Sequence, residues 1–237
     1  MGFTIGGIRQ TRAPRPTVLR PGGTRQDRHR VQDAVTEYAD RWGWPVVPGA
    51  RATKIDGRLR CSCGRANCLA PGAHPLAGDP AADPGPDRPP RRGHTPSDAS
   101  VMLAVGRRFD VLEIAESAAH HAVARLERMG LPLGPVAVTP HHRAWFLVAP
   151  GACADLPDLL YRMGWEGVTL DLRGLGPGQH IAAPPSDLGG LGPVRWLRAP
   201  TAEGARRPPP ARLLLGTLAY VCHRVARGLN GVVPAQS

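Results

Sequence analysis

Three cysteines and a histidine lie close together in the stretch CSCGRANCLAPGAH, as Cys61, Cys63, Cys68 and His74. Three thiolates and one imidazole are a ligand set that closes a tetrahedral structural zinc site. The spacing C-x-C-x4-C-x5-H differs from the common paired C-x2-C, and His94 is an alternative fourth ligand. A disulfide is the weaker alternative in a reducing compartment. The cluster therefore predicts a zinc-binding loop.

An acid at the end of an apolar run, in FDVLEIAES, is the second chemical feature. Side chains of a strand alternate between its two faces, so residues two apart share a face. Two carboxylates at such positions can hold divalent cations, which need several carboxylate oxygens. Here the same-face partner of Glu113 is Ala115, and Asp110 lies on the opposite face. Glu116 follows the strand and needs a turn to point back. The strand therefore carries one acid of such a pair.

Short strands and helices must position these residues. Three pairs of apolar runs, each pair separated by a short turn, alternate with segments of helical periodicity. The expected strands are 44–48, 101–106, 109–114, 135–140, 144–150, 168–174 and 180–186. The expected helices are 31–43, 117–130, 155–165, with Asp155 as N-cap, and 205–230. This order implies an α+β fold in which hairpins form a mixed or antiparallel sheet with helices packed on one face.

The chain divides into a tail, a domain and a final helix. Residues 1–30 contain seven arginines, one aspartate and no apolar periodicity, which predicts a disordered basic tail. Residues 31–200 form the expected domain, with a cysteine-rich loop at 58–76 and a proline-rich loop at 75–96. The helix at 205–230 is expected to pack on that domain.

Charge and composition narrow the classes of partner. The net charge is +11, and the arginine-rich tail favours loose contact with DNA or RNA, although a solvated leader is the alternative. No apolar run approaches the length of a membrane span, and the basic N-terminus lacks the apolar segment of a secretory signal. We expect a soluble, cytoplasmic protein without a membrane partner.

Several stretches, in order, resemble the N-terminal catalytic domain of the bifunctional DNA primase/polymerases, within the archaeo-eukaryotic primase superfamily. The stretch WGWPVVPG is similar to the opening segment of the family, and CSCGRANCLAPGAHP resembles a cysteine-rich insert of many members. SVMLAVGRRFDVLEI is like the paired strands that end in the first metal-binding motif. LDLRGLGPGQHIAAPPS is very similar to the third motif and the segment after it. The resemblance spans roughly residues 33–200 and implies a primase-like core.

The resemblance assigns roles to particular residues. In the family, two acids of the first motif and one of the third hold Mg²⁺ or Mn²⁺ for nucleotidyl transfer. Carried onto this sequence, the first motif gives Glu113 and places Ala115 where the second acid belongs. The third motif retains Asp171 and Arg173, two residues apart on one strand face. Glu113 and Asp171 are therefore the candidate residual metal ligands, with Glu116 as a further candidate.

The second motif departs from the family as well. The family has a histidine before an aromatic strand, where it contacts the phosphates of the nucleotide. The stretch TPHHRAWF has Arg143 at that position, with His142 in the turn. The resemblance makes Arg143, His142 and Arg173 the candidate residues for binding nucleotide or phosphate. The alternative is that Glu113 and Asp171 are solvated, or paired with Arg173 and Arg143.

Two functions from different classes follow. The first is a stand-alone domain that binds nucleic acid or nucleotide, with nucleotidyl transfer weak or absent. Loss of one carboxylate from a two-metal clamp should cost several kcal/mol of transition-state stabilisation, about a thousandfold in rate. The sequence contains no G-x4-GK[ST] motif, so we expect no helicase-like ATPase. The second is a regulatory or scaffold protein that uses the same fold to bind protein partners.

Overall fold

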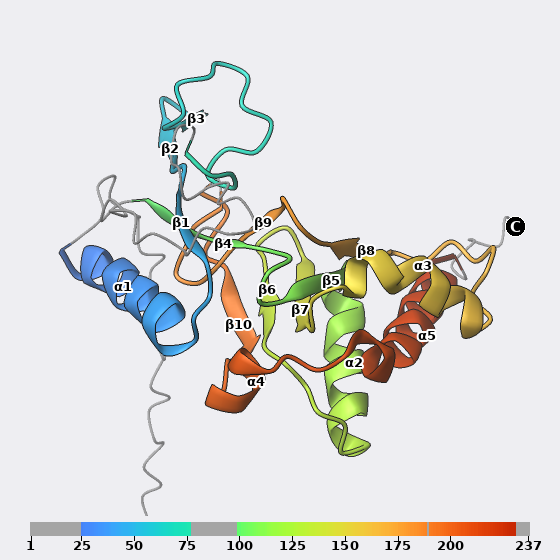
Figure 1. The fold of residues 1–237 in the computed structure, drawn as a ribbon. Helices are drawn as coiled ribbons and strands as arrows, with labels where there is room; N and C mark the ends of the chain where they lie inside the picture. Colours follow the sequence, from blue (N-terminus) through green and yellow to red (C-terminus); the bar gives the residue numbers. More distant parts are fainter. Residues whose placement is uncertain (1–24, 77–98, 189, 231–237) are drawn as a thin grey trace, which may run out of the picture.

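The computed structural model describes residues 25–76, 99–188 and 190–230 of the chain. Helices and antiparallel strands alternate along it, which confirms the predicted α+β class (Figure 1). The helices are α1 Arg25–Thr36, the π-helical turn η1 Glu37–Arg41, α2 Glu116–Arg128, α3 Ala152–Arg162, α4 Ala202–Arg206 and α5 Ala211–Asn230. The strands are β1 Val46–Gly49, β2 Ala52–Ile55, β3 Arg58–Cys61, β4 Ser100–Ala104, β5 Asp110–Ala115, β6 Val136–Val138, β7 Arg143–Val148, β8 Leu172–Leu175, β9 His180–Ala182 and β10 Arg195–Arg198.

The strands of the described residues form two sheets and one separate hairpin. A five-stranded sheet has the order β10-β6-β7-β5-β8, a three-stranded sheet has the order β1-β4-β9, and β2 pairs with β3. Every described pairing is antiparallel. β5 lies inside the larger sheet, between β7 and β8, so its side chains have neighbours on both sides.

Two of the three expected strand pairs do not form hairpins. β6 pairs with β7 as predicted, but β4 pairs with β9 in the smaller sheet while β5 pairs with β8 in the larger one. The chain passes from one sheet to the other between β4 and β5 and again between β8 and β9. These two turns are in close contact, since a Cβ added to Gly106 would lie 2.5 Å from Cα of Pro177. Gly106 has φ of 102°, a backbone conformation that side chains rarely adopt. Adjacency in sequence suggested hairpins, whereas this tight corner sends the strands to different sheets.

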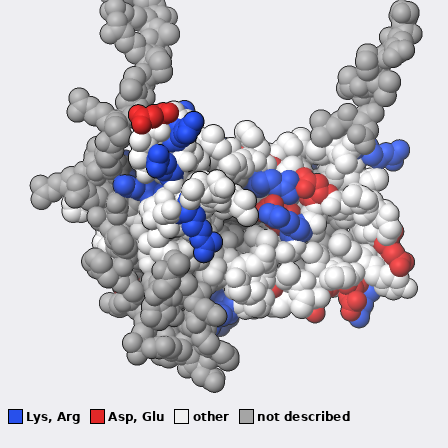
Figure 2. All heavy atoms as spheres, turned by 90° about the horizontal axis from the view of Figure 1, so that it is seen from above, with Lys and Arg blue, Asp and Glu red and all other residues white. Residues whose placement is uncertain are grey.

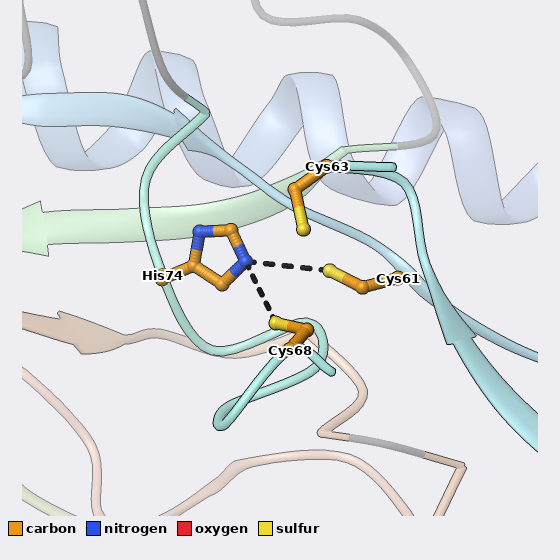
Figure 3. Close-up of side chains that lie close together, drawn as sticks. All are labelled: Cys61, Cys63, Cys68 and His74. Carbon is orange, nitrogen blue, oxygen red and sulfur yellow. Dashed lines mark hydrogen bonds between the residues drawn. The ribbon is translucent and has the colours of Figure 1, made fainter. Parts of the chain in front are cut away.

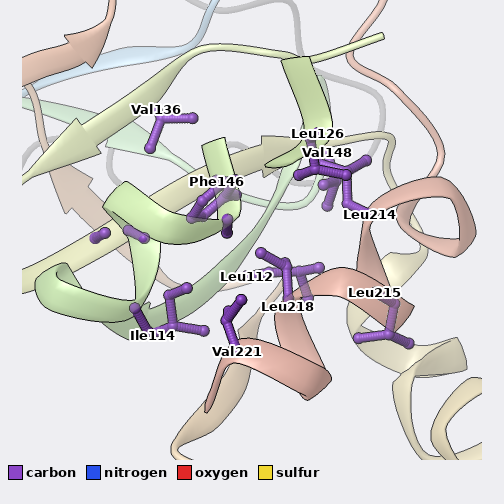
Figure 4. Packing of buried hydrophobic residues seen from close by; sticks show 14 of the residues in the cluster. Leu112, Ile114, Leu126, Val136, Phe146, Val148, Leu214, Leu215, Leu218 and Val221 are labelled. Carbon is purple, nitrogen blue, oxygen red and sulfur yellow. The ribbon is translucent and has the colours of Figure 1, made fainter. Parts of the chain in front are cut away.

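Helices α2, α3 and α5 cover one face of the five-stranded sheet (Figure 1). Leucines of α5 meet apolar residues of β5, β6 and β7 in the main core (Figure 4). Its largest fully buried members are Leu112, Ile114, Leu126, Phe146, Leu214 and Leu215. This packing leaves the opposite face of β5, the one that carries Glu113, free to form a polar site.

A second core joins the N-terminal helices to the smaller sheet. Tyr38, Trp42 and Trp44 pack with their ring centroids 4.8–5.7 Å apart. The Tyr38 hydroxyl donates to the carbonyl of Pro184 at 2.7 Å, and the Trp44 indole donates to the carbonyl of Ala205 at 2.9 Å. Buried aromatic donors thus find partners.

Some predicted boundaries shift. α1 begins at Arg25, six residues before the expected helix start at residue 31, because arginine and glutamine are good helix formers and extend the periodic segment. Residues 1–24 lie outside the described part of the chain, as does almost all of the proline-rich loop. α3 starts after Gly151, so Asp155 lies in its first turn and is not the N-cap. Across the described residues, no helix has the length and apolar character that a membrane crossing requires.

Candidate functional site: an arginine and carboxylate cluster

Strand register brings three polar side chains together on the exposed face of the larger sheet. Glu113 on β5 lies directly opposite Trp145 on β7 and Arg173 on β8. Directly opposed residues of antiparallel strands project to the same side. The side chain of Glu113 is consequently only 4% exposed, although it carries a carboxylate.

Both oxygens of Glu113 accept hydrogen bonds. Its Oε1 accepts from the Nε–H of Arg143 at 2.9 Å and forms an ion pair with Nε of Arg173 at 3.0 Å. Its Oε2 receives the Trp145 indole N–H at 2.8 Å and an Nη–H of Arg173 at 3.0 Å. Burial raises the pKa of Glu113, but the hydrogen bonds from Arg173, Trp145 and Arg143 outweigh it and hold this pKa below its ordinary value. The carboxylate is thus ionised and fully satisfied.

Arg143 connects this carboxylate to Asp171. Its two Nη atoms donate to both oxygens of Asp171, at 2.7 and 2.8 Å, while its Nε donates to Glu113. The bond from Arg143 is the main reason that the pKa of Asp171 is lowered. Arg143 also lies directly opposite Ala115 in the register of β5 and β7. A planar guanidinium therefore joins the two retained acids beside the position of the missing one.

Glu116 belongs to a neighbouring cluster. It is the first residue of α2, and its carboxylate accepts from an Nη–H of Arg195 at 2.5 Å and pairs with Nδ1 of His142 at 3.0 Å. His120, one turn further along α2, has its Nε2 3.8 Å from the same carboxylate. An open pocket of about 440 Å³ is lined by Glu116, His120 and His142 together with Ala115 and Ser117.

The candidate acids do not suit a pair of divalent cations. Such ions need several carboxylate oxygens, yet the four oxygens of Glu113 and Asp171 already accept from N–H groups. Two guanidinium groups lie where a cation would have to enter, and they would repel it. Ala115 adds no ligand. The pairing of Glu113 and Asp171 with Arg173 and Arg143, expected as the alternative, is the arrangement present.

The cysteine cluster forms as the spacing predicts. The ligand atoms of Cys61, Cys63, Cys68 and His74 all lie within 4.8 Å of one another (Figure 3). Nε2 of His74 is 3.3 Å from the sulfur of Cys61 and 3.3 Å from that of Cys68. Ordinary zinc bonds of about 2.0–2.1 Å to nitrogen and about 2.3 Å to sulfur place such atoms roughly 3.5 Å apart in a tetrahedron. The cluster can therefore hold a metal ion such as zinc.

Surrounding bonds prepare these residues as ligands. Nδ1 of His74 donates to the carbonyl of Pro75 at 2.8 Å, which leaves the lone pair of Nε2 directed at the sulfurs. Burial raises the pKa of Cys61, but hydrogen bonds from the backbone of Cys63 and Gly72 outweigh it and lower this pKa to about 6. His94, the alternative fourth ligand, lies outside the described residues.

Sequence reasoning missed the roles of Trp145 and Arg195. Trp145 donates its indole N–H to Glu113 because of the strand register. Arg195 donates a guanidinium N–H to Glu116 because β10 joins the larger sheet. The available signal was that Trp145 and Arg143 are two residues apart and so share a strand face.

Comparison with known proteins agrees with this geometry. The family model described as bifunctional DNA primase/polymerase, N-terminal, matches residues 35–212, well over half of the chain. No curated protein and no solved structure matches it. The matched region contains the cysteine cluster, both carboxylate clusters and both sheets, and it ends at the start of α5. The chain belongs to the family of bifunctional DNA primase/polymerase N-terminal domains.

Proposed function

We propose that this protein is a nucleic-acid-binding member of its family in which nucleotidyl transfer is weak or absent. The observation that carries the proposal is the guanidinium of Arg143, which donates to Glu113 and to Asp171. In an active site of the family, divalent cations would neutralise such acids and activate the incoming nucleotide. Here a fixed side chain neutralises them and supplies no such chemistry.

The substitutions at positions 115 and 143 support each other. Ala115 removes a metal ligand, and Arg143, directly opposite it, donates to the acids that remain. An acid placed at position 115 alone would leave Arg143 bound to the other acids. Replacement of Arg143 alone would leave no carboxylate at position 115. The arrangement therefore has the properties of a stable replacement for a metal site.

We call the clusters around Glu113 and Glu116, with the open pocket beside Ala115, the cleft. Phosphate contact in the cleft falls to residues that reach solvent. The side chain of His142 is 86% exposed, and that of Arg173 is 66% exposed. Arg143, at 27%, is retained between two carboxylates. We assign contact with a phosphate group of nucleotide or nucleic acid to the first two, and a structural role to Arg143.

We further propose that the cysteine cluster binds zinc with a structural role. Three thiolates and an imidazole leave no open coordination position for a substrate. The ion would hold the hairpin of β2 and β3 against β1. The backbone N–H of Ala50, the residue after β1, already donates to the carbonyl of His74 at 2.8 Å.

Binding to a labelled DNA duplex at increasing salt tests the nucleic-acid proposal. The affinity should fall by orders of magnitude between about 50 and 200 mM salt, since released counterions drive such binding. Primer extension with Mn²⁺ on the same samples should give no product. Failure to bind at low salt would contradict the proposal.

The same failure would favour the scaffold function. The end of α3 and the segment after it expose the apolar side chains of Tyr161, Met163 and Val168, at 63%, 36% and 37%. Exposed apolar side chains close together mark protein interfaces more often than nucleic-acid interfaces. A chain that binds no nucleic acid would use this surface for a protein partner.

A further inference from the structure

We propose that the hairpin of β2 and β3 with its cysteine loop, residues 51–76, is the principal contact of the folded chain with double-stranded nucleic acid. We call these residues the ribbon. The proposal rests on the proposed nucleic-acid binding and names the surface that carries it. It places the main affinity outside the cleft that holds Glu113.

The ribbon is a firm element that stands apart from the two sheets (Figure 1). Its strands pair in register from Ala52 and Cys61 to Ile55 and Arg58. The turn residues Asp56 and Gly57 have φ of 49° and 75°, as in the two-residue turns that match strand twist. At the base, the backbone N–H of Arg51 donates to the Ser62 hydroxyl at 2.8 Å. A contact surface on this hairpin therefore needs little ordering when it binds.

The charge of the ribbon is strongly unbalanced. Asp56 is the only acid in this segment, against five basic residues: Arg51, Lys54, Arg58, Arg60 and Arg65. Lys54, Arg58, Arg60 and Arg65 are exposed, and within the described part of the chain none of these four has an ion-pair partner. Their charges are available to a polyanion.

The arginines of the cleft are in the opposite situation. Arg143 and Arg173 are bound to Glu113, and Arg195 is bound to Glu116. A phosphate that contacts any of them competes with an existing ion pair and meets a carboxylate nearby, so it gains less binding energy there than from a guanidinium without a partner. Seen from above the molecule, basic side chains gather on the left with an acidic side chain at the upper edge of the group, and basic and acidic ones lie in contact nearer the centre (Figure 2). Phosphate groups should therefore prefer the ribbon.

The two faces of the ribbon indicate how it would meet the ligand. Alternation places Thr53, Ile55, Arg58 and Arg60 on one face, and Ile55 is 47% exposed. Leu69, in the cysteine loop, is fully exposed at 101%. Exposed apolar groups beside unpaired arginines are typical of a surface that is covered in a complex.

The partner should be a duplex that is bound without sequence preference. Residues 51–76 contain no Phe, Tyr or Trp, so the ribbon lacks the stacking platform that single-strand binders use. A duplex offers twice the phosphate charge per length of a single strand, and a major groove about 12 Å wide admits a two-stranded ribbon. Arginine contacts to phosphate position a protein without reading sequence.

The test compares two pairs of arginines in the full chain by fluorescence anisotropy of a labelled duplex. Arg58→Ala/Arg60→Ala removes two ribbon charges. Arg128→Ala/Arg162→Ala removes two exposed charges at the C-terminal ends of α2 and α3, neither of which has an ion-pair partner among the residues that the structure describes. The ribbon variant should lose affinity on the order of tenfold or more at low salt, and its salt slope should fall by about two. The control should bind as wild type does.

A third variant, Arg58→Lys/Arg60→Lys, should retain the affinity of wild type, because lysine preserves the charge that a phosphate meets. Equal losses in the ribbon and control variants, or an unchanged salt slope, would overturn the ribbon proposal while leaving nucleic-acid binding intact. A loss confined to single-stranded DNA would overturn it as well. A wild-type chain that binds no duplex would remove the proposed function itself, and this inference with it.

Discussion

At the scale of residues, the central feature is a buried carboxylate that is fully satisfied by N–H donors. Glu113 is 4% exposed and accepts three hydrogen bonds, two of them from guanidinium groups, and its Oε1 also forms an ion pair with Nε of Arg173. An ionised group in such a place is stable only while its partners remain, since an unpaired buried charge is costly. The cluster is therefore a structural element of the larger sheet.

Arg143→Ala tests this interdependence. The substitution removes one donor from Glu113 and both donors from Asp171, so it should lower the free energy of unfolding by about 2–3 kcal/mol. Arg173 still binds Glu113, which keeps the loss below that of a fully unpaired buried charge. Urea denaturation measures the difference. Arg162→Ala, at an exposed position that has no ion-pair partner within the described part of the chain, should stay within about 0.5 kcal/mol of wild type. Equal effects of the two substitutions would contradict a structural role for Arg143.

Acid should weaken the cluster of Glu113, Asp171 and their arginine partners in a defined pH window. The pKa values of Glu113 and Asp171 are lowered in the folded chain from ordinary values of 4.5 and 3.8. Their stabilisation is then fully present above the ordinary values and is lost as pH falls through the lower folded values. The free energy of unfolding of wild type should fall more steeply with acid than that of Glu113→Gln/Asp171→Asn, and the two curves should converge. A constant difference between them would contradict the lowered pKa values.

At the scale of elements, the cysteine cluster and α5 belong to separate parts of the fold. A backbone hydrogen bond from Ala50 to the carbonyl of His74 ties the ribbon to the residue after β1, and α5 closes the main core over β5 and β8. The family match ends at the start of α5, yet Leu214, Leu215 and Leu218 on this helix are completely buried. The helix is therefore part of the folded unit.

Elemental analysis should find one zinc ion per chain in wild type and much less in Cys63→Ser. Removing the ion with a chelator should release residues 51–76, because the ligands would lose the bonds that hold them together. Amide hydrogen exchange should then accelerate in this segment and remain slow in β5, which lies in a separate core. Cys153→Ser, outside the cluster, is the matched control and should keep its zinc. A metal-free wild-type protein with a protected ribbon would contradict the account.

Leu218→Ala should destabilise the protein by about 2–5 kcal/mol, the usual cost of an unfilled core position. Leu218 is 0% exposed and lies in the core shared by α5, α2 and the larger sheet. Arg224→Ala, on the exposed side of the same helix, should change the free energy of unfolding by less than about 0.5 kcal/mol. Thermal or urea denaturation would separate the two, and equal effects would argue against a core role for α5.

Periodicity predicted most of these elements but not all of their pairings. The strands that became β4 to β9 and the helices α2, α3 and α5 follow from apolar spacing, as does the hairpin of β6 and β7. The pairing of β4 with β9 and of β5 with β8 depends on the contact between Gly106 and Pro177, which are far apart in sequence. The cysteine site was predictable because its ligands are local. The Trp145 bond to Glu113 was not, because it requires strand register.

At the scale of the whole molecule, charge is divided between two places with different properties. The cleft pairs Arg143, Arg173 and Arg195 with carboxylates, whereas Lys54, Arg58, Arg60 and Arg65 of the ribbon have no ion-pair partner among the described residues. A chain of this family that binds nucleic acid through the ribbon and holds its former metal ligands with arginine would retain the binding part of the ancestral activity. We propose this division as the organising feature of the protein.

Primer extension tests this account most directly. Wild type and Asp171→Ala are compared on one template and primer duplex with Mn²⁺, at protein concentrations where anisotropy shows that the duplex is bound. Wild type is predicted to give no more product than Asp171→Ala, because Arg143 already neutralises both remaining acids. Robust extension by wild type that disappears in Asp171→Ala would contradict the account and would show that the acids still hold a catalytic metal ion.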